Sequence, residues 1–154
     1  MKLLGVIGLV MSTTMTGFLL SKKLEKRVKI CFQLSSLCDA LLYDMSYRAT
    51  PVCTLLQTLI KSESFAELSF ISDENIKHEK EIVSCLKSAE NKELSRFLYS
   101  LGKSDIINQK RLIEGFKTYI LHSLDYYEQA KTKNTKLYIT FGAFFGIVSA
   151  LIIV

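Results

Sequence analysis

The sequence predicts an all-α membrane protein in which transmembrane helices at the amino and carboxyl ends flank an antiparallel helical bundle. Two stretches of 18 residues, 3–20 and 137–154, contain no charged side chain. Each is long enough to cross a hydrocarbon core of about 30 Å at about 1.5 Å per residue. The rest of the chain has one proline, Pro51, and no Asn-Gly turn or alternating β-branched run to indicate strands. We therefore expect one bundle domain, residues 21–136, between the two spans.

Basic side chains flank both predicted spans on the side of the bundle domain. Residues 30–130 carry 11 Lys or Arg against 14 Asp or Glu, a net charge of −3, although the whole chain carries +5. Because Lys and Arg close to a span are retained in the cytoplasm, we expect the bundle domain there and both termini at the opposite face of the cell membrane. Charge placed in this way favours lipid head groups over nucleic acid as the partner. The two basic collars are Lys22, Lys23, Lys26, Arg27 and Lys29, and Lys131, Lys133 and Lys136.

An alternative interpretation of residues 1–20 is a cleaved signal peptide, with Lys2 ahead of an apolar run over residues 3–11. No A-x-A-like cleavage site follows this run, and the five basic residues downstream would have to be translocated. We therefore interpret the segment as an anchor.

Apolar spacing and capping residues predict the helices of the bundle domain. No helix breaker lies between residues 20 and 49, so the first span and the following helix are predicted to form one rod. Thr50 and Pro51 predict the N-cap and first position of a second helix, to about residue 61. Further helices are expected at about 75–89 and 92–101. The first seam, at spacings typical of shallow helix packing, is Cys31, Leu34, Cys38, Leu41 and Met45.

Gly102 and Ser104 predict the boundary before the last helix. Gly102 is placed as the C′ residue that ends the preceding helix, and Ser104 as the cap of the next one. The last helix is expected to continue into the second span. Its apolar seam recurs every seven residues at Ile106, Ile113, Ile120 and Tyr127.

The chain contains no residue pattern that predicts an active site, a metal site or a cofactor. His78 and His122 lie 44 positions apart, outside any H-x-x-H or H-E-x-x-H pattern, and no phosphate loop or nucleophile elbow is present. Acid pairs such as Glu90 with Glu93 are typical of a solvated helix face. The four cysteines include no C-x-x-C and are interpreted as small buried side chains in a reducing compartment: Cys31, Cys38, Cys53 and Cys85.

Small residues recur at every fourth position in both predicted spans. Such stripes let helix backbones approach closely in lipid, which makes them candidate contact surfaces. The alternative is that small residues are common in spans without any contact role. The stripes are Gly8, Ser12 and Thr16 in the first span, and Gly142, Gly146 and Ala150 in the second.

The order of motifs resembles the stage III sporulation protein AB family over essentially the whole chain. The opening Lys2-Leu3-Leu4-Gly5 leads into a short span and a basic stretch. Tyr47 to Pro51 resembles the family's Y-x-x-T-P junction, and residues 61–77 look shorter and less apolar than the family's pattern. The second junction, L-G-x-[ST]-D-x-x-x-Q, is matched by Leu101, Gly102, Ser104, Asp105 and Gln109.

The resemblance implies a non-enzymatic platform subunit of the secretion-like complex between mother cell and forespore, with a helical domain similar to the type II secretion platform protein F. Its implied partners are a secretion-type ATPase in the mother-cell cytoplasm and other membrane subunits; a homo-oligomer is possible. The junction residues are expected to act as caps first and as partner contacts second. The open alternatives are a two-span sensor or regulatory adaptor and, as a third class, a membrane enzyme that uses a cysteine.

Overall fold

The computed structural model describes the backbone of residues 2–153 apart from 48–50 and the positions 73, 75, 77 and 79. It describes the side chains of residues 21–47, 51–133, 136 and 137, with the same gaps. Every regular element in this part of the chain is a helix, which confirms the all-α fold class. The chain divides into two compact units, one formed by Arg27–Asp125 and the other by Met1–Lys26 with Tyr126–Val154.

Two long helices begin and end the chain. Helix α1 spans Lys2–Tyr47, and helix α5 spans Ile106–Ile153. The prediction that each terminal segment continues into a helix of the bundle domain without a break is therefore confirmed for the backbone. Among the described residues, no helix combines the length and apolar character needed to cross a membrane. The side chains of the predicted spans 3–20 and 137–154, Leu137 excepted, lie outside those residues.

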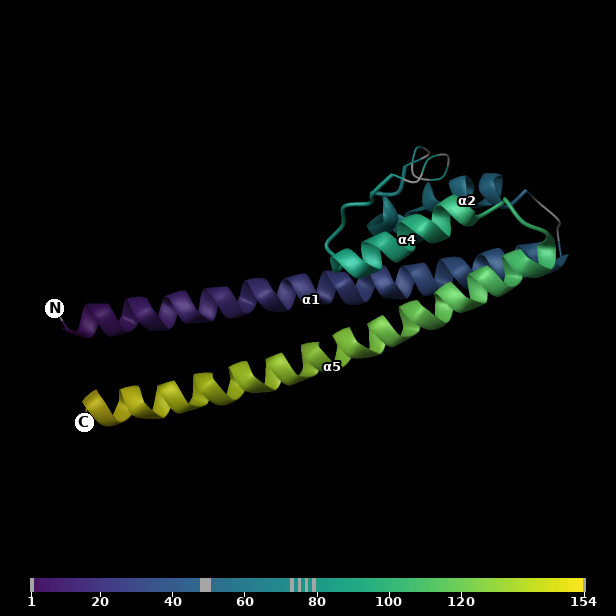
Figure 1. Ribbon diagram of the computed structural model, residues 1–154. Coiled ribbons are helices and arrows are strands. Elements are labelled where there is room, and N and C mark those ends of the chain that lie inside the picture. Colours follow the sequence, from purple (N-terminus) through teal and green to yellow (C-terminus); the bar gives the residue numbers. More distant parts are fainter. Residues whose placement is uncertain are drawn as a thin grey trace. The chain divides into compact units, whose positions relative to one another are not determined.

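The shorter helices whose bounds fall among the described residues lie in the central unit. They are α2 (Val52–Ile60), the 3-10 helix η1 (Glu63–Leu68) and α4 (Ser88–Ser100). Figure 1 shows α2 and α4 alongside the carboxyl-terminal half of α1.

Polar contacts fix the relative direction of α1 and α5 within the central unit. Lys117 Nζ lies 2.5 Å from Asp39 Oδ1, and Lys110 Nζ donates to Ser46 Oγ at 3.0 Å. The later residue of α5 thus meets the earlier residue of α1, as required for the predicted antiparallel arrangement.

The core of the central unit follows the predicted seams. Cys31, Leu34, Cys38 and Leu41 of α1 are fully buried, whereas Met45 is half-buried. Burying such side chains stabilises the fold by about 1.5–3 kcal/mol each. Core side chains from the other elements include Leu56, Leu68, Leu94, Phe97, Leu98, Ile113, Phe116 and Ile120.

Ile106 departs from the predicted seam of the last helix. Ile113 and Ile120 are completely buried, but Ile106 is 62% exposed. It is the first residue of α5 and lies two turns before Ile113, so the heptad repeat continues past the end of the core.

The helix predicted over residues 75–89 is wrong over residues 80–87, which form an irregular segment. Ser95 Oγ of α4 accepts the Ile82 N–H at 3.1 Å, and Ser84 Oγ accepts the Leu86 N–H at 3.1 Å. Serine hydroxyls that bond the backbone offer it an alternative to helical pairing. These contacts hold the segment against α4.

Helix α4 begins at Ser88, four residues before the predicted start at 92. Glu90 caps this start, because its Oε2 accepts the Lys87 N–H at 2.9 Å. Glu90 is only 5% exposed, so its placement on a solvated helix face was wrong.

Candidate functional site

The first of the two family-like junctions links α1 to α2. The Pro51 carbonyl accepts the N–H groups of Thr54 and Leu55 at 3.0 and 3.1 Å, which makes Pro51 the N-cap of α2. The sequence predicted Thr50 as the cap and Pro51 as the first helical residue, so Pro51 lies one position earlier in the helix than expected. Thr50 itself falls outside the described residues.

Gly102 ends α4 at the second junction, as predicted. Its φ of +78° is a left-handed conformation that glycine adopts without steric cost. The Leu101 N–H still donates to the Phe97 carbonyl at 3.1 Å, so Leu101 is the C-cap and Gly102 the C′ residue.

Cys53 of α2 brings the two junctions together. Its Sγ donates to the Leu101 carbonyl at 3.9 Å, and a Cβ added to Gly102 would lie 2.9 Å from the same sulfur. The close approach of α2 therefore requires a residue without a side chain at position 102. This contact was not predicted, because Cys53 belongs to no recognisable sequence pattern.

Asp105, rather than Ser104, caps α5. Asp105 Oδ2 accepts the Asn108 N–H at 3.4 Å, and Oδ1 accepts from Asn108 Nδ2 at 2.5 Å. The bond from the Asn108 side chain holds the pKa of Asp105 below its ordinary value. Ser104 contributes its carbonyl, which accepts from Gln109 Nε2 at 2.6 Å. Gln109 thus closes the turn between the two helices, while the prediction that Ser104 is the cap was wrong.

Two buried acceptors near these junctions have no hydrogen-bond partner. Asp44 Oδ2 and Gln109 Oε1 are shielded from solvent and unpaired in the part of the chain that the structure describes. A buried acceptor left unpaired costs about 1–3 kcal/mol, so such groups are often retained for a functional reason.

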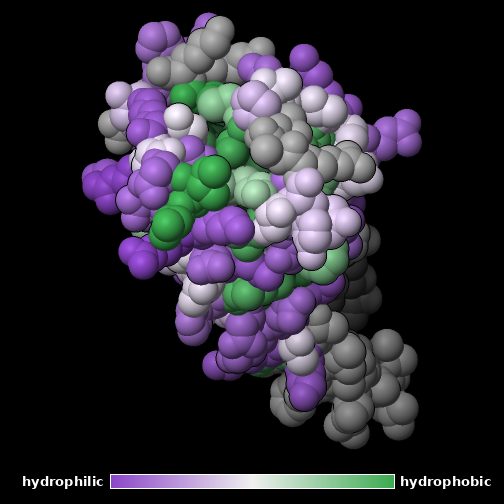
Figure 2. Space-filling view, turned by 90° about the vertical axis from the view of Figure 1, so that its right-hand side faces the viewer, coloured by the Kyte–Doolittle hydropathy of each residue, from purple (hydrophilic) through white to green (hydrophobic). Residues whose placement is uncertain are grey.

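Large hydrophobic side chains are exposed around the same helix ends. Tyr43 and Tyr47 of α1, with ring centroids 4.8 Å apart, are 64% and 75% exposed. Ile106 and Ile107 of α5 are 62% and 64% exposed. Figure 2 views the molecule from the side of these helix ends and shows hydrophobic side chains surrounded by hydrophilic ones. Exposed aromatic and aliphatic side chains within a polar rim are typical of a protein-binding surface. The adjacent pair Ile106-Ile107 was no signal by itself, because the adjacent pair Leu37-Cys38 is fully buried.

Arg27, counted in the first basic collar, has a structural role. Its Nε donates to the Cys85 carbonyl at 2.7 Å and so ties the irregular segment 80–87 to α1. An arginine engaged with protein backbone is less available to a lipid head group than its neighbours in the collar.

No group of three potential metal ligands occurs among the described residues. His78 and His122 are both exposed, and all four cysteines are free thiols, with Cys53 and Cys85 half-buried.

Burial raises the pKa of Cys31 and of Cys38 to about 12, from 9.0. Between these values the folded state retains protons that the unfolded state releases, so stability is expected to fall as pH rises from about 9 to 12. Urea unfolding at pH 8 and pH 10.5 measures the loss. Replacing both cysteines with alanine should reduce this pH dependence, whereas an unchanged dependence would contradict its assignment to the thiols.

Comparison with known families shows to which family the chain belongs. The family model described as stage III sporulation protein AB matches residues 2–154. The chain belongs to the stage III sporulation protein AB family. It is 29% identical to stage III sporulation protein AB of Bacillus subtilis (strain 168) over 170 aligned positions, which cover 99% of each chain. No solved structure matches it. Membership confirms the resemblance carried by the junction motifs, and it supports a role in sporulation.

The small-residue stripes lie on the two long helices. Gly8, Ser12 and Thr16 fall on the helical backbone of α1, and Gly142, Gly146 and Ala150 on that of α5. Their side chains lie outside the described residues.

Proposed function

We propose that this member of the stage III sporulation protein AB family is a non-enzymatic platform subunit of the secretion-like complex between mother cell and forespore. The observation that carries the proposal is the contact of Cys53 with Leu101 and Gly102, which joins the two family junctions. A subunit of this kind positions its partners and needs no reactive group of its own. Its domain would link a secretion-type ATPase in the mother-cell cytoplasm to membrane subunits of the complex.

Both terminal segments serve as membrane anchors in this proposal. The uncharged stretches 3–20 and 137–154 are continuous in backbone with α1 and α5, so each anchor extends directly into a helix of the central unit. The basic collars keep the central domain in the cytoplasm and place both termini at the opposite face. A helix that continues from a span into a domain transmits position better than a flexible linker would.

The exposed side chains around the helix junctions form the proposed partner surface. Tyr43, Tyr47, Ile106 and Ile107 supply apolar contact area, and tyrosine is among the residues that contribute most to binding energy at protein interfaces. The capping bonds of Asp105 and Gln109 hold the start of α5 in place beneath this surface. The residues of the second family motif are thus structural themselves and position the apolar side chains that meet a partner.

Copurification from sporulating cells tests the proposed function. The tagged full chain, extracted in mild detergent, is expected to retain a secretion-type ATPase and other membrane subunits. Replacing Ile107 with Asp should lower ATPase recovery about tenfold or more, because a charge would be buried in the contact. Replacing the similarly exposed Phe32 of α1 with Asp is the matched control and should leave recovery unchanged. Absence of any ATPase, or recovery of a soluble signalling partner from growing cells, would favour the sensor alternative.

The anchors provide a second readout in the same experiment. Replacing Gly142 and Gly146 with Leu should remove other membrane subunits from the purified complex, since bulky side chains block close helix approach in lipid. Recovery of the ATPase should persist in this variant. If the full set of membrane subunits were still recovered, the stripe on the second anchor would have no contact role.

A further inference from the structure

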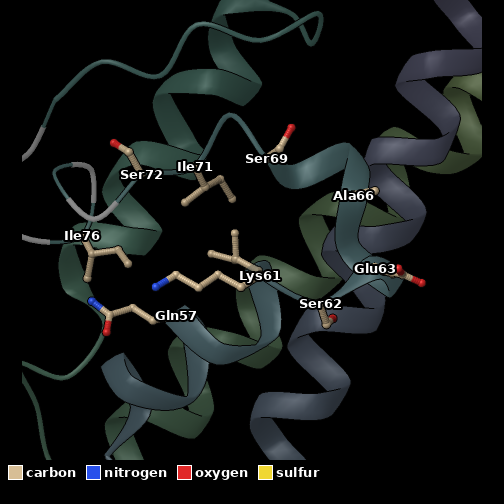
Figure 3. Close-up of a pocket in the computed structure, with 10 residues that line it drawn as sticks. Gln57, Lys61, Ser62, Glu63, Ala66, Ser69, Ile71, Ser72 and Ile76 are labelled. Carbon is tan, nitrogen blue, oxygen red and sulfur yellow. The ribbon is translucent and has the colours of Figure 1, made fainter.

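A polar-rimmed pocket lies between the end of α2, the helix η1 and the segment that follows it. The pocket has a volume of about 550 Å³, and Ile71 and Ile76 contribute apolar surface to it. Figure 3 shows the Lys61 side chain extending between Gln57 and Ile71 toward Ile76. The pocket lies away from the helix junctions described above, in another part of the central unit.

Lys61 is an exposed cation without a partner in this pocket. Its ammonium group makes no hydrogen bond or ion pair with any residue that the structure describes. Among the described residues that line the pocket, Glu63 is the one acid, and it directs its carboxylate away from Lys61 (Figure 3). A cation beside aliphatic side chains fits a ligand that carries a carboxylate next to an aliphatic group.

The irregular segment before α4 displays groups of this kind. Ile82 is 3% exposed and its N–H is bonded to Ser95, so it fixes the segment against the protein. Val83 is 85% exposed, more than any other large hydrophobic side chain that the structure describes, and Glu81 is exposed on the other side of Ile82. The exposure pattern alternates along these three residues, so both neighbours of the buried Ile82 face outward. A carboxylate and an aliphatic side chain are thereby presented together on a fixed backbone.

We propose that the Lys61 pocket of one copy binds the segment 81–83 of a second copy. The Glu81 carboxylate pairs with the Lys61 ammonium, and Val83 packs on the half-buried Ile60, which also lines the pocket. Pocket and segment are different surfaces of one chain, so the contact is head-to-tail and can continue beyond a dimer. The inference does not depend on the proposed function, since self-association is measured with the purified chain alone.

Charge reversal tests the pairing in the full chain reconstituted in detergent micelles, by sedimentation velocity. Lys61→Glu and Glu81→Lys should each weaken self-association about tenfold or more, because each creates a like-charge contact. The double variant, which carries both reversals in one chain, should recover association. Mixing the two single variants should also recover association, because the intact pocket meets the intact segment and the reversed pocket meets the reversed segment.

Controls separate this result from a general effect of charge. Arg111→Glu and Glu114→Lys on α5 alter exposed residues outside both surfaces, and they should leave association unchanged. Circular dichroism of each variant confirms that it retains its helices. A monomeric wild-type chain would overturn the proposal, as would single reversals without effect or a double variant that fails to recover.

Discussion

Replacing Phe116 with alanine is expected to lower the free energy of unfolding by about 3–5 kcal/mol. The Phe116 ring stacks on Phe97 with centroids 4.0 Å apart and an interplanar angle of 7°, and the two side chains are 6% and 2% exposed. Truncation removes this contact between α4 and α5 and leaves a cavity in the core. Because the chain has no tryptophan, urea unfolding of the full chain in detergent is followed by tyrosine fluorescence.

Phe32 provides the matched control for this variant. It is also a phenylalanine on a long helix but is 62% exposed, so its replacement by alanine should change stability by no more than about 0.5 kcal/mol. Equal losses in the two variants would contradict the assignment of Phe116 to the core.

Replacing Gly102 with alanine is expected to cost about 2 kcal/mol, the second large effect. The φ of +78° is unfavourable for alanine, and the added Cβ would lie 2.9 Å from Cys53 Sγ. Two separate causes therefore add at one position. Unfolding in urea measures the total.

A double variant separates the two causes at Gly102. With Cys53 replaced by alanine the clash is gone, so the further change of Gly102 to alanine should cost only about 1 kcal/mol for the backbone conformation. If the cost of changing Gly102 were the same with and without Cys53, the contact between the junctions would carry no energy. The cycle thus tests the feature on which the proposed function rests.

The spacing of apolar residues and the capping residues predicted those features of the fold that depend on a single helix. The seam from Cys31 to Leu41 is buried as expected, because a helix face is encoded at local spacing. Gly102 was placed correctly for a similar reason, since a helix end in left-handed conformation selects glycine whatever lies nearby.

The errors arose where distant residues decide the local structure. Residues 80–87 have apolar spacing compatible with a helix, but Ser95 of α4 binds the Ile82 N–H and holds the segment in irregular form. Glu90 looked like a solvated acid and is instead buried at the start of α4, where it caps the Lys87 N–H. Neither the irregular segment nor the burial of Glu90 can be predicted from the residues of a single helix.

The candidate site was predicted in outline and completed by the structure. Pro51, Gly102, Asp105 and Gln109 were identified from motifs, and each lies at a helix junction as expected. The contact between the junctions through Cys53 joins residues 48 positions apart, and no local pattern reports such a pair.

The orientation of the chain in the membrane tests the central claim most directly. In growing cells, a cysteine-free variant receives one new cysteine, either in place of the exposed Lys92 or appended after residue 154. A membrane-impermeant maleimide is predicted to label the appended cysteine in intact cells, and the cysteine at position 92 only after the cells are permeabilised. Labelling at position 92 in intact cells, or release of the protein from membranes at alkaline pH, would contradict a platform anchored at both ends with its central domain in the cytoplasm.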